Sequence, residues 1–131
     1  MPIVDRVSPT FFVHDVRKSI DWYVRVLGFR VVFEHGGYAG VALGPAEIHL
    51  AEAAPRDGLQ YKAGCYLRVA SGIDEYIAQI QGTGQALTAT LKDHPVYDMR
   101  EATVRDPDGN DLYIGQPLAA STARPPVPAE P

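Results

Sequence analysis

Apolar and polar residues alternate along several short stretches of the chain, and these stretches are bounded by glycine, proline or aspartate. Alternation with a period of two is typical of strands that bury one face and expose the other. Strands are predicted in this way at residues 7–13, 29–34, 38–43, 47–51, 64–69, 86–91, 100–104 and 110–115. Other stretches repeat apolar residues every three or four positions, which predicts helices over residues 16–27 and 73–80.

Polar residues and glycines mark the expected ends of these helices. Asp15 is a suitable N-cap for the first helix, and Gly28 is its stop signal. Ser71 is expected to cap the second helix, with Asp74 in the capping-box position. Pro9 lies within the first predicted strand but has no N–H to donate to a sheet. We therefore expect that strand at a sheet edge, or a hinge at the proline.

The predicted elements repeat in the same order. The last two strands are joined by the turn 106–109, Asp-Pro-Asp-Gly, in which proline presets φ, aspartate bonds nearby amides and glycine tolerates positive φ. The turn at residues 44–45, Gly-Pro, occupies the corresponding place in the first half. Each half therefore reads β-α-β-β-β.

This repeat predicts an α+β fold in which two β-α-β-β-β modules, at about residues 7–52 and 64–115, form curled mixed sheets within one domain, 1–117. In each module one face of the sheet packs on the helix and the other lies on the concave side. Two concave sheets that face each other enclose a cavity, a common type of ligand site. Residues 118–131 are rich in alanine and proline, and we expect them to be disordered.

Composition narrows the possible functions. The chain has 131 residues and a net charge of −4, which argues against duplex nucleic acid or an anionic membrane as its partner. The single Cys65 excludes a disulfide within the chain. Neither a signal peptide nor a membrane-spanning apolar run is visible, so a cytoplasmic protein is expected.

Three motifs carry a resemblance to a known family. They are residues 13–23 (Val-His-Asp-Val-Arg-Lys-Ser-Ile-Asp-Trp-Tyr), residues 27–29 (Leu-Gly-Phe) and residues 106–110 (Asp-Pro-Asp-Gly-Asn). Together they resemble the vicinal oxygen chelate superfamily, which includes glyoxalases, extradiol dioxygenases and bleomycin-binding resistance proteins. The resemblance extends over residues 7–115.

Within this superfamily the sequence is most similar to the bleomycin-resistance proteins. Residues 37–41, Gly-Tyr-Ala-Gly-Val, resemble their Asp-Phe-Ala-Gly-Val strand, and residues 105–110 resemble their Arg-Asp-Pro-Ala-Gly-Asn turn. Pro9 falls where those proteins have a proline at which an N-terminal strand crosses to the partner subunit. The resemblance thus implies a homodimer with a swapped N-terminal strand.

The resemblance also gives the positions that hold metal ligands in the metal-dependent members. These positions fall here on Ser8, His49, Gly64 (or Cys65, in a register shifted by one) and Tyr113. A divalent transition metal needs several converging imidazole or carboxylate ligands. Only His49 is a good ligand, although Glu47 shares its strand face and could join it. We therefore expect no metal ion and no other cofactor.

The remaining reactive side chains have ordinary explanations. Cys65 would be a nucleophile only if it were exposed with a lowered pKa, and its position in the alternation favours packing under the second helix. His14, His35 and His94 are expected to be solvated surface residues, since they fall in predicted loops or turns.

The concave faces are expected to carry a ligand-binding set of aromatic and polar residues. Strand alternation and the resemblance to the resistance proteins select Phe12, Tyr38, Glu47, His49, Tyr66, Arg68, Tyr97 and Tyr113. Tyr97 is included because it lies near the place where the resistance proteins carry a ligand-stacking tryptophan. The alternative is that the tyrosines of the strands simply fill the core.

Three functions remain open. The first is a homodimer that binds and sequesters a small aromatic or cationic compound without turnover, with a bleomycin-type glycopeptide antibiotic as a candidate. The second is a glyoxalase-type lyase or isomerase, or a dioxygenase, that uses a non-standard metal set at His49 and Glu47. The third is an immunity domain for a product of its own pathway.

Overall fold

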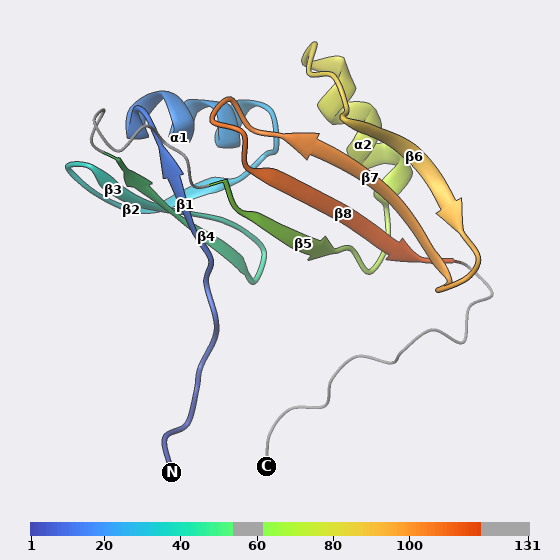
Figure 1. Ribbon diagram of the computed structural model, residues 1–131, viewed down its shortest axis with the longest axis horizontal. Helices are drawn as coiled ribbons and strands as arrows, with labels where there is room; N and C mark the ends of the chain where they lie inside the picture. The colour runs from blue at the N-terminus through green and yellow to red at the C-terminus, as the bar shows by residue number, and fades with distance from the viewer. Residues whose placement is uncertain (54–61, 119–131) are drawn as a thin grey trace.

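The structure is a computed structural model that describes residues 1–53 and 62–118, and within them the order β-α-β-β-β occurs twice (Figure 1). The first module consists of β1 (Thr10–Val13), α1 (Val16–Arg25), β2 (Arg30–His35), β3 (Tyr38–Leu43) and β4 (Ala46–Glu52). The second consists of β5 (Gly64–Arg68), α2 (Ile73–Gly82), β6 (Ala89–His94), β7 (Met99–Arg105) and β8 (Asp111–Pro117). The predicted two-module α+β fold is confirmed.

Each module forms one mixed sheet of four strands, in the orders β1-β4-β3-β2 and β5-β8-β7-β6. The first strand of each module pairs in parallel with the last, and the other pairs are antiparallel. Figure 1 shows the sheets side by side, with α1 over the first and α2 over the second. The sheets do not close into a barrel, so the side of each sheet opposite its helix is open.

Strand alternation decides which side chains are buried. The residues that face the helices form a continuous core: Phe11, Val13, Ala39, Val41, Ile48, Leu50, Leu67, Ala102, Val104, Leu112 and Ile114. Their neighbours along each strand point to the opposite side, because successive side chains of a strand alternate between its faces. We call these two surfaces the open faces of the sheets.

The N-cap of α1 is the residue that the sequence predicts, whereas the N-cap of α2 is not. Asp15 caps α1, and its carboxylate accepts a hydrogen bond from the Lys18 N–H at 3.1 Å. The prediction that Ser71 caps α2 is wrong, because the N-cap is Gly72, in a left-handed conformation and without a side-chain cap. The Ile73 N–H instead donates to Oε1 of Gln116 on β8, at 2.9 Å.

Two strands start three residues later than predicted. β1 begins at Thr10 rather than at residue 7, because Pro9 has no N–H and contributes only its carbonyl, which accepts from the His49 N–H at 2.9 Å. β6 begins at Ala89 and extends to His94, with an irregular register between Ala89 and Lys92. His94 is therefore in a strand and not in the expected loop.

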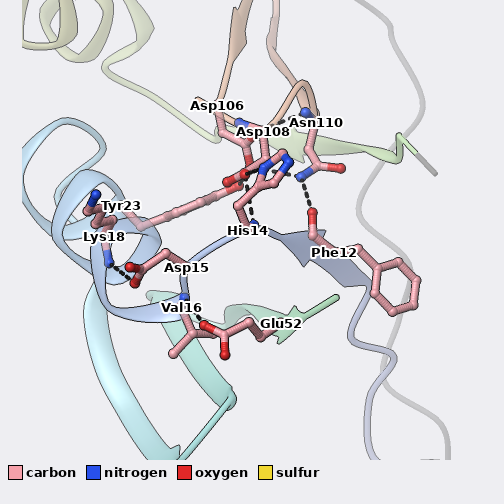
Figure 2. A network of polar contacts seen from close by, with 10 residues as sticks. All are labelled: Phe12, His14, Asp15, Val16, Lys18, Tyr23, Glu52, Asp106, Asp108 and Asn110. Carbon is pink, nitrogen blue, oxygen red and sulfur yellow. Dashed lines mark hydrogen bonds and ion pairs between the residues drawn. The ribbon is translucent and has the colours of Figure 1, made fainter. Parts of the chain in front are cut away.

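A buried polar network joins the two modules (Figure 2). Asp106, in the turn before β8, is 3% exposed and accepts hydrogen bonds from the Asp108 and Asn110 amides, the Asn110 side chain and the Tyr23 hydroxyl of α1. Burial raises the pKa of Asp106, although these donated hydrogen bonds oppose the shift. The Asn110 amide also donates to the Phe12 carbonyl of β1, at 3.2 Å. The turn therefore positions one module against the other.

Two further features concern the helices and the C-terminal end of the described residues. Neither described helix is long and apolar enough to cross a membrane. Leu118 donates its N–H to the Asp98 carbonyl at 3.0 Å. The rest of the tail that we expect to be disordered, from residue 119 on, lies outside the described residues.

Candidate functional site

The open faces carry all the strand residues that were selected as candidate ligand contacts. Phe12, Tyr38, Tyr66 and Tyr113 are between 37% and 46% exposed, and Arg68 is exposed as well. Glu47 and His49 are half-buried on the same side of the first sheet. The alternative interpretation, in which the tyrosines of these strands fill the core, is wrong.

On the first sheet a group of hydrogen-bonded side chains surrounds His49. Nδ1 of the His49 ring lies 2.6 Å from the Tyr38 hydroxyl, and Nε2 lies 2.7 Å from Oε2 of Glu47. A carboxylate only accepts, so Nε2 carries the hydrogen of the contact with Glu47. Arg6 donates to the other Glu47 oxygen at 3.0 Å. We call Tyr38, Glu47 and His49 the His49 cluster.

On the second sheet a corresponding group surrounds Glu101 of β7. The Tyr66 hydroxyl donates to Oε2 of Glu101 at 2.6 Å, and the Tyr97 hydroxyl donates to Oε1 at 2.7 Å. The His94 ring stacks on Tyr97, with ring centroids 5.2 Å apart, and its Nε2 lies 3.7 Å from Oε1 of Glu101. We call Tyr66, His94, Tyr97 and Glu101 the Glu101 cluster.

Burial and hydrogen bonds to a carboxylate both raise the pKa of these phenols. The pKa of Tyr66 is raised by burial and by its hydrogen bond to Glu101, and the pKa of Tyr97 is raised mainly by its hydrogen bond to the same carboxylate. The two hydroxyl hydrogens therefore remain on the tyrosines and point to Glu101.

A glycine beneath each cluster lets an aromatic ring lie across the sheet. A Cβ added at Gly115 of β8 would overlap the Tyr66 hydroxyl, so Tyr66 reaches from β5 to Glu101 only because residue 115 lacks a side chain. A Cβ at Gly40 of β3 would likewise overlap the Phe33 ring, which makes an edge contact with His49 at a centroid distance of 5.2 Å.

Two hollows adjoin the second cluster. An apolar pocket of about 500 Å³ lies between the β3–β4 turn and the start of α2, lined among others by Leu43, Pro45, Tyr66 and Arg68. A more polar groove of about 520 Å³ runs along β6 and β7, and Glu101 lines it. Tyr66 lines the apolar pocket, and it is hydrogen-bonded to Glu101, which lines the polar groove. The Glu101 cluster therefore borders both hollows.

The model of the glyoxalase/bleomycin resistance protein/dioxygenase superfamily matches residues 4–114. The chain belongs to this superfamily. Among curated relatives, the bleomycin resistance proteins of Geobacillus stearothermophilus and Staphylococcus aureus are each 30% identical to it over 127 residues, covering 84% of this chain and 95% of theirs.

Three solved structures have the same fold as this chain. A bleomycin resistance determinant encoded on the transposon Tn5 has a TM-score of 0.74 at 23% identity, covering 87% of this chain and 98% of its own. A bleomycin-binding protein complexed with bleomycin has a TM-score of 0.72 at 23% identity, covering 86% and 98%. TioX from Micromonospora has a TM-score of 0.73 at 21% identity, covering 85% and 98%.

The metal that many superfamily members use does not fit the side chains found here. Both ring nitrogens of His49 are within 2.7 Å of other partners, Tyr38 and Glu47, so the ring offers no lone pair that is not already engaged. Of the other expected positions, Ser8 and Tyr113 provide neutral hydroxyls and Gly64 provides nothing. Residues 1–53 and 62–118 contain no group of three or more histidine, cysteine, aspartate or glutamate side chains that could hold a metal ion.

Cys65 does not have the environment of a nucleophile. It is half-buried and packs against the core, as the strand alternation indicates. Burial raises the pKa of its thiol to about 11, whereas a reactive cysteine needs a lowered pKa.

Sequence reasoning missed Glu101, and it misplaced His94. His94 was expected to be a solvated surface residue but is half-buried against Glu101 and Tyr97. The signal for Glu101 was present, since Ala102 and Val104 of β7 face the core and their neighbour must face the other way. Tyr97 lies in the turn between β6 and β7, and the structure connects it to the open face through Glu101.

Proposed function

We propose that this protein binds and sequesters a small aromatic compound without metal-dependent turnover. The observation that carries the proposal is the pair of hydrogen-bonded clusters, one on the open face of each sheet, in which a carboxylate is bonded to an aromatic side chain: Glu47 to His49 in the first, and Glu101 to Tyr66 and Tyr97 in the second. Exposed aromatic rings held in fixed positions offer flat contact area to a planar ligand at a low cost in conformational entropy. The engaged ring nitrogens of His49 argue against the alternative, a metal-dependent lyase or dioxygenase.

The relatives favour one class of ligand. Bleomycin resistance proteins are 30% identical to this chain over most of its length, and a protein of the same fold is known in complex with bleomycin. A bleomycin-type antibiotic is therefore the first compound to try, with Phe12, Tyr38, Glu47, His49, Tyr66, Arg68, Tyr97 and Tyr113 as the proposed contacts. We place this function in the cytoplasm.

We also propose that the working unit is a homodimer. The apolar residues of the N-terminal segment, Met1, Ile3, Val4 and Val7, are exposed, and Figure 1 shows this segment extending away from the sheets. Exposed apolar residues on an extended segment are suited to packing on a second copy. Sedimentation velocity should give a dimer for the full chain and a monomer for a chain that lacks residues 1–8. A monomer for the full chain as well as for the shortened chain would contradict this part of the proposal.

Calorimetry on chelator-treated protein with metal-free bleomycin tests the binding function. We expect saturable binding, and mass spectrometry should recover the antibiotic unchanged. Tyr38→Ala and Tyr66→Ala should each weaken binding several-fold, whereas Arg25→Ala, on the exposed side of α1, should not. If neither bleomycin nor other planar compounds bound, and the protein held a stoichiometric transition metal that His49→Ala removed, the glyoxalase-type enzyme would be favoured.

A further inference from the structure

The Glu101 cluster has a hydrogen-bonding polarity that restricts what can bind to it. Tyr66 and Tyr97 both donate their hydroxyl hydrogens to Glu101, so each phenol oxygen is left with lone pairs only. The Glu101 carboxylate is an acceptor as well, and each of its oxygens has room for a further donor. These three groups therefore present only acceptors to a ligand, and His94, stacked on Tyr97, is the one member of the cluster that can donate.

The same cluster lies beside space that a ligand can fill. Glu101 lines the polar groove along β6 and β7, while Tyr66 lines the apolar pocket formed with Leu43 at the end of β3 and Pro45 of the β3–β4 turn. Glu101 remains 20% exposed at its side chain, so it is reachable. A ligand can thus place an apolar ring in the pocket and a polar group at Glu101.

We propose that the Glu101 cluster binds a protonated nitrogen group, such as a primary amine or an amidine, that is attached to the aromatic part of the ligand. The ring occupies the apolar pocket beside Tyr66, and the N–H groups donate to the phenol oxygens and to Glu101. The inference rests on the proposed binding function and names the ligand as a cationic aromatic compound. Glu101, which the sequence analysis did not select, is the residue that favours a positively charged ligand.

An anionic ligand is the competing possibility, because positive side chains lie nearby. Lys92 lines the polar groove, and Arg68 lines the apolar pocket. A carboxylate placed at the cluster would, however, face the Glu101 carboxylate and the lone pairs of two phenols, with the ring N–H of His94 as the one donor among the four side chains of the cluster. The charge of the preferred ligand therefore distinguishes the two possibilities.

Matched probes that share one ring test this. We would measure dissociation constants of 2-naphthylmethylammonium, 2-naphthylmethanol and 2-naphthylacetate by ligand fluorescence on the full chain. We expect the ammonium compound to bind about ten-fold or more tightly than the acetate, in line with hydrogen bonds to charged groups. Glu101→Gln should remove that preference, and Tyr97→Phe should weaken ammonium binding more than it weakens binding of the neutral alcohol.

The control removes the same charge elsewhere. Glu75→Gln alters an exposed carboxylate on α2 and should leave the preference unchanged. Equal or tighter binding of the acetate, or an unchanged preference in Glu101→Gln, would overturn the inference while leaving ligand binding itself in place. If none of the three probes bound and bleomycin bound, the pocket and cluster would be wrong as the subsite; if bleomycin failed too, the proposed function would fall with the inference.

Discussion

Gly115 controls the Glu101 cluster at the scale of a single residue. Because a Cβ at this position would overlap the Tyr66 hydroxyl, Gly115→Ala should move the phenol away from Glu101 while the strand itself is retained. We expect the pKa of Tyr66, which is raised in the wild type, to fall toward the ordinary tyrosine value of about 10. Spectrophotometric titration should then show one more tyrosine ionising in the ordinary range.

A second glycine provides the control for this substitution. Gly82 ends α2, and a Cβ there would have no atom within 4 Å, so Gly82→Ala should leave the tyrosine titration unchanged. If the titration of Gly115→Ala matched that of the wild type, the Tyr66 hydroxyl would not need a glycine at residue 115 to reach Glu101.

Cys65 gives a second test at this scale, because it is the one cysteine of the chain. With its pKa raised from 9.0 to about 11, its thiolate fraction at neutral pH should be about 100-fold lower than that of an unperturbed thiol. Iodoacetamide should therefore alkylate the native protein far more slowly than the urea-unfolded protein. Equal rates would restore Cys65 as a candidate nucleophile.

At the scale of elements, the start of α2 depends on a residue of another strand. Gln116 of β8 accepts the hydrogen bond of the Ile73 N–H, a role that a capping side chain usually has. Gln116→Ala should lower the free energy of unfolding by about 0.5–2 kcal/mol, the usual cost of losing an N-cap. Ser71→Ala should have no such effect, since Ser71 does not cap the helix. Urea denaturation of both variants would decide, and the reverse ranking would contradict the structure.

The junction between the modules depends on another buried bond. The Tyr23 hydroxyl of α1 donates to Asp106 at 2.9 Å, and both side chains are almost fully buried. Tyr23→Phe should cost about 1–3 kcal/mol in unfolding free energy, because it removes one donor from a buried carboxylate. Tyr113→Phe, on the exposed side of β8, should change it by less than about 0.5 kcal/mol. Equal losses in the two variants would mean that the bond does not stabilise the junction.

Local patterns in the sequence were sufficient for the elements and their faces, but contacts between distant residues were not accessible. Alternation put Tyr38, Tyr66 and Tyr113 on the open faces correctly, because a strand alone fixes that parity. The cap from Gln116 and the Tyr66–Glu101 bond join residues 43 and 35 positions apart, and no local pattern records such pairs. The late start of β6 likewise depends on its irregular pairing with β7.

At the scale of the whole molecule, the duplicated module explains why the site has two similar halves. Each sheet turns an apolar face toward a helix and leaves the other face to carry a carboxylate with aromatic neighbours, Glu47 in the first and Glu101 in the second. The network around Asp106 joins the two halves, so the proposed ligand contacts on both sheets depend on one polar junction (Figure 2).

A crystal structure of the protein with metal-free bleomycin would test the central claim most directly. The account predicts the antibiotic against the open faces, with its rings beside Tyr38 or Tyr66 and with His49 still hydrogen-bonded to Tyr38 and Glu47. Antibiotic bound on the helical side, or a metal ion coordinated by His49 in place of those bonds, would contradict it.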